Sequence, residues 1–472
     1  MNIIHVSSEV FPFSKTGGLA DVVYALPKAQ RKLGESVKIF TPLYKGISDS
    51  FNLIDTGFKT IVNTTVGDFD FSVYKYLSDN NVEIYFFKNP HFFNRKDLYS
   101  ENGYDYRDNY LRFGCFCIAT LHFTDYFNIP ADIIHIHDWQ ASFLPIFLKT
   151  EYPFIKSKVA LTIHNLAFQG IFDHSCLNVL QLPNYLYDMN YLEFYGTVNV
   201  LKGAIIFSDY FTTVSPTYAN EIMTEKFGCG LEGVIYANKH KLKGILNGVD
   251  YDIWNPEHDN KIIKNYGINN LKSKLANKED FTKNFFIESS LPLFIFISRF
   301  TTQKGADVLI EFLESKNINK AAFAILGDGP KDIANRFIQI GLNKSNIFVY
   351  TGFNEALAHK IYAAGDFLLM PSRFEPCGLS QLIAMKYGTI PIVTRTGGLK
   401  DTVIDVDEGG YGFCIDDVNI DMLCSAIERA LNLYKRKRQR EVIIKKCMQI
   451  DFSWTKSARE YINIYRALLE DH

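Results

Sequence analysis

Two stretches of the chain combine a lysine or an arginine with glycine directly after an apolar run. They are Lys15-Thr-Gly-Gly-Leu-Ala-Asp21 and Ser298-Arg-Phe-Thr-Thr-Gln-Lys-Gly305. Glycine lets an anion approach the backbone, and the helical pattern that follows each stretch would offer free N–H groups. Because Arg299 and Lys304 follow one strand, the second stretch suits a pyrophosphate better than a single phosphate. A glycine turn with solvated cations is the alternative for either stretch by itself.

A rigid loop with one carboxylate is predicted at Pro371-Ser-Arg-Phe-Glu-Pro-Cys-Gly-Leu-Ser-Gln381. Two prolines and a glycine surround Glu375, and a carboxylate held in this way after a strand indicates a binding site. We interpret Cys377 as packing rather than as a nucleophile, because the sequence pairs no base with it. Thr396-Gly-Gly-Leu-Lys-Asp401 repeats the TGGLxD pattern of residues 16–21 and indicates a second anion-receptive turn.

Histidines at strand ends could serve a metal or a sugar. His135 and His137 are two positions apart, hence on one face of a strand. No third ligand is indicated, so hydrogen-bonded histidines are favoured over a metal site. Trp139 could stack on a sugar ring, and His164 ends another strand, where a buried structural histidine is the alternative. Three Asp-x-Asp patterns follow no convincing buried strand, so no metal is predicted at residues 68–70, 250–252 or 405–407.

Strands and helices alternate in both halves of the chain. Short apolar runs at residues 2–6, 36–41, 132–137 and 159–163 are followed by a second series from residue 293 to residue 393. This alternation predicts an α/β protein with two doubly wound parallel sheets. Such sheets bind ligands outside the carboxyl ends of their strands, so we expect a cleft between two domains. Residues 52–90 predict strands of an inserted or edge layer, and residues 247–256 predict a hinge.

Composition excludes several classes of protein. With 472 residues, 47% of them hydrophobic and 22% charged, the chain is expected to form two large domains or three small ones and is not disordered. The 50 basic residues nearly cancel the 52 acidic ones, so no field favours nucleic acid or an anionic membrane. The eight cysteines are sparse and indicate reduced thiols. The sequence shows neither a leader pattern nor an apolar run of ~20 residues, and we expect a cytoplasmic protein.

Taken together, these stretches resemble the bacterial glycogen synthases and the plant starch synthases. The resemblance runs in the family's order over nearly the whole chain and is carried by residues 15–21, 137–139, 161–170, 245–250, 299 with 303–305, 375–379 and 395–403. It implies a GT-B-type α/β fold, in which two Rossmann-like doubly wound domains, residues 1–246 and 257–452, face each other across a cleft. A helix over residues 453–472 would cross back to the first domain.

The same resemblance implies an activity. The chain would transfer glucose from ADP-glucose to the nonreducing end of an α-1,4-glucan such as glycogen, with retention of configuration and without a metal or other cofactor. Arg299 and Lys304 would neutralise the leaving diphosphate, Glu375 would hold the donor sugar, and His164 would contact the glucose near its anomeric carbon. The other implied substrate-binding residues are Lys15, Gly17, Gly18, Asp21, Asp138, Trp139, Asn165, Asn247, Phe353, Cys377, Gly378, Leu379 and Thr396.

Two positions distinguish this chain from some relatives. Ile383 occupies the second position of the Glu-x7-Glu pattern found in many other GT-B transferases, which agrees with the glycogen and starch synthase pattern. Phe353 stands where some synthases have a tyrosine, so stacking on the base survives while a phenolic hydrogen bond is lost. Two alternatives therefore stay open: a GT-B transferase that uses a UDP-sugar and another acceptor, and a non-catalytic protein that binds glucan or nucleotide sugar.

Overall fold

A computed structural model describes residues 1–101, 103–316 and 318–470. The chain divides into two compact units. Unit 1 comprises Met1–Gly248 together with the C-terminal stretch that begins at Trp454, and unit 2 comprises Val249–Ser453. Within the described ranges, every helix is too short or too polar to cross a lipid bilayer.

Unit 1 is built on a nine-stranded sheet with the order β14-β13-β9-β8-β1-β2-β5-β4-β3. Neighbouring strands are parallel from β14 to β5, and β4 and β3 add an antiparallel edge. This edge accounts for the layer expected within residues 52–90. The strands are β1 (Asn2–Val6), β2 (Ser36–Pro42), β3 (Ile54–Thr64), β4 (Gly67–Leu77), β5 (Glu83–Lys88), β8 (Ile133–His137), β9 (Lys158–Ile163), β13 (Tyr210–Thr213) and β14 (Leu242–Gly244).

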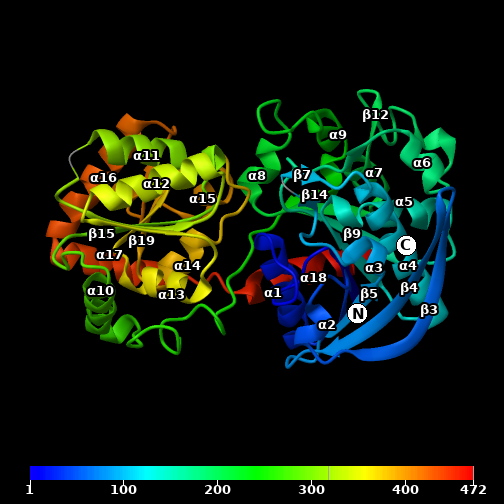
Figure 1. The fold of residues 1–472 in the computed structure, drawn as a ribbon, viewed down its shortest axis with the longest axis horizontal. Helices are drawn as coiled ribbons and strands as arrows, with labels where there is room; N and C mark the ends of the chain where they lie inside the picture. The colour runs from blue at the N-terminus through cyan, green and yellow to red at the C-terminus, as the bar shows by residue number, and fades with distance from the viewer. Residues whose placement is uncertain (102, 317, 471–472) are drawn as a thin grey trace. The chain divides into compact units, whose positions relative to one another are not determined.

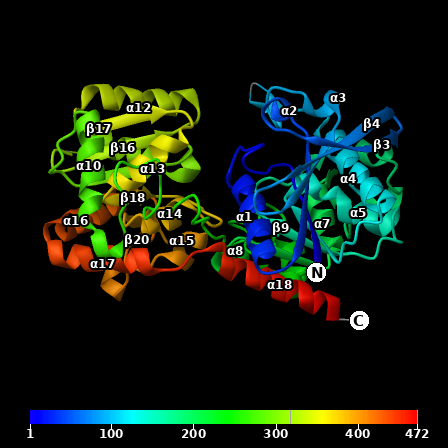
Figure 2. The ribbon, with the colours of Figure 1, turned by 90° about the horizontal axis from the view of Figure 1, so that it is seen from below.

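The longest helices of unit 1 are α1 (Gly18–Lys32), α4 (Asn109–Tyr126) and α18 (Trp454–Glu470). The last of these, red in Figures 1 and 2, lies beside α1 although more than 400 residues separate them in sequence. Trp454, Ala458, Tyr461 and Tyr465 bury one face of α18 against the sheet and α1. The shorter helices are α2 (Ile47–Ser50), α3 (Pro90–Phe93), α5 (Phe143–Thr150), α6 (Ser175–Val179), α7 (Val200–Phe207), α8 (Pro216–Glu221) and α9 (Glu232–Ala237).

Unit 2 contains a six-stranded parallel sheet with the order β17-β16-β15-β18-β19-β20. The strands are β15 (Leu293–Ile297), β16 (Ala322–Gly327), β17 (Ile347–Thr351), β18 (Phe367–Met370), β19 (Ile390–Thr394) and β20 (Phe413–Ile415). Figure 1 shows helices on both faces of this sheet, as a doubly wound fold requires. They are α10 (Lys272–Asn284), α11 (Ala306–Ser315), α12 (Lys331–Asn343), α13 (Glu355–Ala364), α14 (Ser380–Lys386), α15 (Gly397–Thr402), α16 (Ile420–Lys435) and α17 (Lys437–Gln449).

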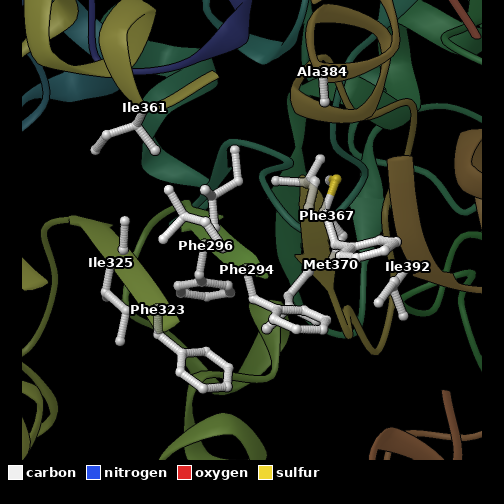
Figure 3. Close-up of a cluster of buried hydrophobic side chains, with 14 of the residues drawn as sticks. Phe294, Phe296, Phe323, Ile325, Ile361, Phe367, Met370, Ala384 and Ile392 are labelled. Atoms are coloured by element: carbon white, nitrogen blue, oxygen red, sulfur yellow. The ribbon is translucent and has the colours of Figure 1, made fainter. Parts of the chain in front are cut away.

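The core of unit 2 gathers large aromatic side chains on its central strands (Figure 3). Phe294 on β15 is paired in register with Phe323 on β16 and with Phe367 on β18. The ring centroids lie 5.5 Å and 5.0 Å from that of Phe294. Strands buried on both faces read as continuous apolar runs, which is why these segments could be recognised in the sequence.

Candidate active site

Unit 2 carries its candidate residues at the point where the strand order reverses. β15 lies in the middle of the sheet, with β16 on one side and β18 on the other, so the loops that leave β15 and β18 diverge to opposite faces. This switch point is where open α/β sheets bind ligands. The loop after β15 carries Arg299 and Lys304, and the loop after β18 carries Glu375.

Backbone and side-chain hydrogen bonds join these two loops to each other. The N–H of Arg373 donates to the carbonyl of Gln303 at 2.8 Å, and the Gln303 amide donates to the carbonyl of Phe374 at 3.3 Å. Gly305 has a φ of 71°, and a Cβ on it would lie 2.0 Å from the carbonyl oxygen of Pro371. The close approach of the two loops therefore depends on glycine at residue 305.

Lys304, which is partly buried, and Glu375, which is buried, form an ion pair across the two loops. The ammonium of Lys304 donates to Oε2 of Glu375, which also accepts from the hydroxyl of Ser372 at 3.2 Å. Glu375 is only 5% exposed. Arg299, by contrast, is exposed on the strand-end loop. The arrangement places one paired and one solvated cation at the same sheet edge, and these charges can bind a diphosphate.

The second TGGLxD turn supports the Glu375 loop. The N–H of Gly398 donates to the carbonyls of Glu375 and Pro376 at 3.1 Å and 3.2 Å. A Cβ on Gly397 would lie 2.0 Å from the Glu375 carbonyl oxygen, and one on Gly398 would lie 2.2 Å from that of Cys377. The sequence suggested an anion-receptive turn here, and that interpretation is wrong for Gly398, whose N–H is already bonded to the neighbouring loop.

The remaining candidate residues of unit 2 are distributed around this loop. Gln381, which the sequence analysis did not single out, donates from its side chain to the carbonyls of Cys377 and Gly378, both at 3.0 Å. Cys377 is buried, Gly378 has a φ of 74°, and Leu379 directly precedes α14. Thr396 directly precedes α15 and is buried. Phe353 follows β17 with 77% of its surface exposed, so its ring face is accessible for stacking.

Unit 1 has its own switch point at β1, between β2 and β8. The loop after β1 carries Lys15, Gly17 and Gly18, and the two glycines are exposed at the start of α1. Lys15 forms an ion pair with Asp21 at 2.7 Å. Glu9 fixes the loop, because its buried carboxylate accepts from the N–H and the hydroxyl of Thr16, both at 2.6 Å, and from Tyr99 at 2.7 Å.

The loop after β8 begins with a strained residue. Asp138 has a φ of 54°, a region that costs a non-glycine residue about 1–3 kcal/mol. Its carboxylate accepts from the N–H of His164 at 2.7 Å, which ties the ends of β8 and β9 together. Burial raises the pKa of Asp138 to about 7, against the opposing effect of that hydrogen bond and one from the N–H of Asn165. The strain is thus compensated by a contact that positions His164 and Asn165.

Trp139 packs inside unit 1 and is only 8% exposed. Its ring centroid lies 5.2 Å from that of Phe113 and 5.4 Å from that of Phe172, and a Cβ on Gly170 would lie 2.6 Å from its ring. This burial differs from the exposed stacking platform that the sequence suggested. Asn247 is also buried, and its amide oxygen has no hydrogen-bond partner among the residues that the structure describes. An unsatisfied oxygen of this kind could accept a hydrogen bond from a hydroxyl group of a ligand.

Four histidines lie together beneath the strand ends of unit 1. Nδ1 of His5 lies 3.0 Å from Nε2 of His137, and Nδ1 of His137 lies 3.0 Å from Nε2 of His164. His135 packs on His137 with a centroid distance of 4.2 Å. His5 could not be recognised from the sequence, because one histidine in an apolar strand carries no functional signal. Ring nitrogens of His5, His135 and His137 all lie within 4.8 Å of one another, which alone would permit a metal.

This histidine cluster predicts acid lability of unit 1. Burial lowers the pKa of His5 to about 4 and that of His164 to about 3, and it lowers the pKa values of His135 and His137 well below 6.5. The unfolded chain therefore takes up about four protons as pH falls from 6.5 towards 4. Asp138 has the opposite effect, because its raised pKa lets the folded chain bind about one proton that the unfolded chain does not bind in this range. Stability present above pH 6.5 should fall by about 4 kcal/mol per pH unit near pH 5.

Urea unfolding at pH 7.5, 6.5 and 5.5 measures this slope. In Trp254→Phe, the two remaining tryptophans, Trp139 and Trp454, both report on unit 1. The matched control is His174→Asn in the same background, which removes an exposed histidine and should leave the slope unchanged. A free energy of unfolding that stays constant or rises between pH 7.5 and pH 5.5 would contradict the prediction.

Comparisons with known proteins identify the family. Residues 2–237 match the family model described as starch synthase catalytic domain, and residues 277–446 match that of glycosyl transferases group 1. The chain is 42% identical over 490 residues to the glycogen synthase of Thermodesulfovibrio yellowstonii, covering 99% of this chain and 98% of that protein. The chain belongs to the glycogen and starch synthase family. The resemblance expected from the sequence is confirmed.

Other glycogen and starch synthases are similar to this chain over nearly its whole length. The glycogen synthase of Aquifex aeolicus is 42% identical over 465 residues and covers 98% of each chain. The catalytic domain of starch synthase IV from Arabidopsis thaliana, solved with ADP and acarbose, superposes with a TM-score of 0.92 at 32% identity and covers 99% of each chain. A sucrose-phosphate synthase from Thermosynechococcus elongatus shares the fold, with a TM-score of 0.64 at 17% identity. This member of the synthase family is therefore a glycosyltransferase of GT-B type with two Rossmann-like units.

Proposed function

We propose that this chain elongates an α-1,4-glucan such as glycogen by transferring glucose from ADP-glucose to its nonreducing end, with retention of configuration. The observation that carries the proposal is the Lys304–Glu375 pair at the switch point of unit 2, with Arg299 on the same loop as Lys304. A carboxylate for sugar hydroxyls beside two cations for a diphosphate fits a nucleotide-sugar donor. Membership in the synthase family and the ADP and acarbose bound to the starch synthase relative support the choice of donor and acceptor.

Donor contacts are proposed for each unit by itself. Arg299 and Lys304 contact the diphosphate, and Glu375 accepts hydrogen bonds from the sugar hydroxyls. The backbone at residues 377–379 completes the cradle for the sugar and the phosphates, and Thr396 stands beside it. On unit 1, Lys15 and the amides of Gly17 and Gly18 face the phosphates and the glucose, with Asp21 holding Lys15. His164, Asn247, Asp138, Trp139 and Asn165 serve the sugar side, and the burial of Trp139 assigns it a supporting contact rather than open stacking.

The chemistry follows from these contacts. As the glycosidic bond of the donor breaks, the diphosphate gains negative charge, and Lys304 and Arg299 stabilise it electrostatically. The glucosyl group gains positive character, which the carbonyl of His164 can stabilise. Glu375 accepts hydrogen bonds from Lys304 and Ser372, and the proposal gives it the role of holding the sugar rather than of bonding covalently to it. The acceptor hydroxyl then attacks from the face that the diphosphate leaves, which retains the configuration.

We further propose that catalysis needs no metal and takes place in the cytoplasm. Arg299 and Lys304, in the loop after β15, supply the positive charge that a divalent cation would otherwise bring to the diphosphate. All eight cysteines have free thiols, six of them buried, as is usual in a reducing compartment. Activity should therefore persist in EDTA.

The deciding experiment is a donor panel with a product assay. The purified chain is given ADP-glucose, UDP-glucose or GDP-mannose, with and without glycogen, and nucleotide release and glucan mass are measured. Glycogen-dependent release of ADP with growth of the glucan is expected, and loss of activity in EDTA would refute the metal-free step. Preference for UDP-glucose would indicate that phenylalanine rather than tyrosine at residue 353 changes the choice of donor. Binding of the donor without release of its nucleotide would identify a non-catalytic protein.

A further inference from the structure

A continuous chain of hydrogen bonds runs through unit 1 and ends at His164. It starts at the backbone carbonyl of Leu161, which can only accept a hydrogen bond. The hydroxyl of Thr212 donates to that carbonyl at 3.4 Å, and the hydroxyl of Thr162 lies 2.7 Å from that of Thr212. Because the hydroxyl of Thr212 donates its single proton to the carbonyl, the hydroxyl of Thr162 is the donor in the bond between the two threonines. The acceptor at Leu161 thus fixes the direction of the first two bonds.

The direction continues through the C-terminal helix. Because Thr162 has used its proton, it accepts from Nε2–H of His135 at 2.6 Å. Nδ1 of His135 then carries no proton, and its lone pair accepts a hydrogen bond from the hydroxyl of Tyr465 at 2.7 Å. Tyr465 in turn accepts from the amide nitrogen of Gln30 at 3.5 Å, so the amide oxygen of Gln30 faces His5. The hydroxyl on α18 therefore decides which end of the Gln30 amide the next histidine meets.

Three histidines carry this direction to the candidate active site. The Gln30 oxygen accepts from Nε2–H of His5 at 2.8 Å, which leaves Nδ1 of His5 to accept from Nε2–H of His137 at 3.0 Å. Nδ1 of His137 then accepts from Nε2–H of His164 at 3.0 Å. His164 is the only partly exposed member of the four, and its Nδ1 bonds to no other residue in the described part of the chain.

Burial keeps these rings neutral, so each can hold only one proton and the tautomer becomes the variable that matters. A metal at His5, His135 and His137 competes with this arrangement. All six ring nitrogens of those residues already have hydrogen-bond partners. The lone pair on Nδ1 of each ring, which a metal would need, already accepts a hydrogen bond from His137, Tyr465 or His164. The hydrogen-bonded chain accounts for every nitrogen without a metal.

We propose that this chain, anchored at the Leu161 carbonyl and routed through Tyr465, fixes His164 as the Nε2–H tautomer and so presents the lone pair of its Nδ1 to a hydroxyl group of the donor sugar. Gln30, His5, His137 and Tyr465 are then positioning residues that act through His164. The tautomer follows from the geometry alone, and only the sugar contact rests on the proposed function.

Nitrogen-15 NMR of the full chain with labelled histidine tests the tautomers. Neutral Nε2–H rings are expected for all four histidines at pH 7.5, each assigned by a single His→Asn variant. The Nε2 protons of His5, His137 and His164 should also be visible, because each is held by an acceptor. A Nδ1–H tautomer or a charged ring at any of these three would overturn the proposal. So would a stoichiometric metal found by elemental analysis of the purified chain.

Tyr465→Phe tests the effect on catalysis. This variant removes the hydroxyl that orients Gln30, so the His164 tautomers should mix, and kcat should fall about fivefold, as expected for one lost neutral hydrogen bond, at unchanged KM for glycogen. The matched control is Tyr152→Phe, which removes another tyrosine hydroxyl of unit 1 that bonds to a histidine, His122, at 2.8 Å, outside the chain. Equal kcat in the two variants, or unchanged histidine signals in Tyr465→Phe, would overturn the proposal. If the wild-type chain transfers no glucosyl group, the function fails while the NMR test still stands.

Discussion

Lys304→Ala and Glu375→Ala should each lower kcat with ADP-glucose and glycogen by about 10²-fold or more. Lys304 stabilises charge that develops on the leaving diphosphate, and loss of one such group typically costs this much. Glu375 holds both the sugar and the ammonium of Lys304, so its removal also leaves a partly buried cation without its partner. Steady-state kinetics with saturating donor measure the effect, and a urea unfolding curve for each variant separates loss of catalysis from loss of folding.

Asp307→Asn is the matched control for this pair. Asp307, in the first turn of α11, forms an ion pair at 2.7 Å with Arg373 of the Glu375 loop, and this pair is far more exposed than the Lys304–Glu375 pair. An exposed pair contributes only ~0–1 kcal/mol, so kcat should stay within about threefold of the wild-type value. Near wild-type rates in both Lys304→Ala and Glu375→Ala would remove the central residues from the proposed site. An equal loss in Asp307→Asn would show that tethering of the Glu375 loop, rather than charge at the diphosphate, is what matters.

Gly398→Ala is expected to lower kcat by about 10²-fold, although residue 398 has no proposed contact with substrate. The new Cβ would lie 2.2 Å from the carbonyl oxygen of Cys377, and backbone cannot move aside as a flexible side chain can. The loop that carries Glu375 must therefore shift, and a displacement of about 1 Å from the reacting geometry can cost on the order of 10²-fold. Kinetics give the loss, and binding of ADP measured by calorimetry should weaken in parallel.

Gly233→Ala provides the comparison for this substitution. Gly233 lies in α9, has no positive φ, and a Cβ on it would meet nothing within 4 Å. Alanine there should leave kcat unchanged and should slightly stabilise the helix. If Gly398→Ala retains wild-type kcat and ADP affinity, the second TGGLxD turn does not support the Glu375 loop in the way that the distances indicate.

Local patterns were enough to predict much of the candidate site. Lys15, Arg299, Lys304 and Glu375 each follow an apolar run that becomes a buried parallel strand, and the chemistry of strand ends in α/β sheets made them candidates. The order of the motifs along the chain indicated the synthase family, which the relatives confirm. Such features are readable because charge, glycine and strand periodicity are properties of neighbouring residues.

Other features depend on contacts between distant segments. The TGGLxD turn at residues 396–401 looked like an anion site, but its Gly398 N–H is bonded to the Glu375 loop more than 20 residues earlier. Trp139 looked like a sugar platform, but Phe113, Phe172 and Gly170 enclose it. In both cases the local pattern is compatible with two environments, and only the packing of a remote segment selects one.

Short-range periodicity and motif order were enough to predict the alternating α/β class, the strand-end residues of each unit and the family. The position of Tyr465 on α18 beside His135 and Gln30, and the hydrogen-bonded row of His5, His137 and His164, could be recognised only in the folded chain. The physical reason is that a hydrogen bond between side chains hundreds of residues apart depends on distance and direction in space. Neither quantity is encoded in the spacing of residues along the chain.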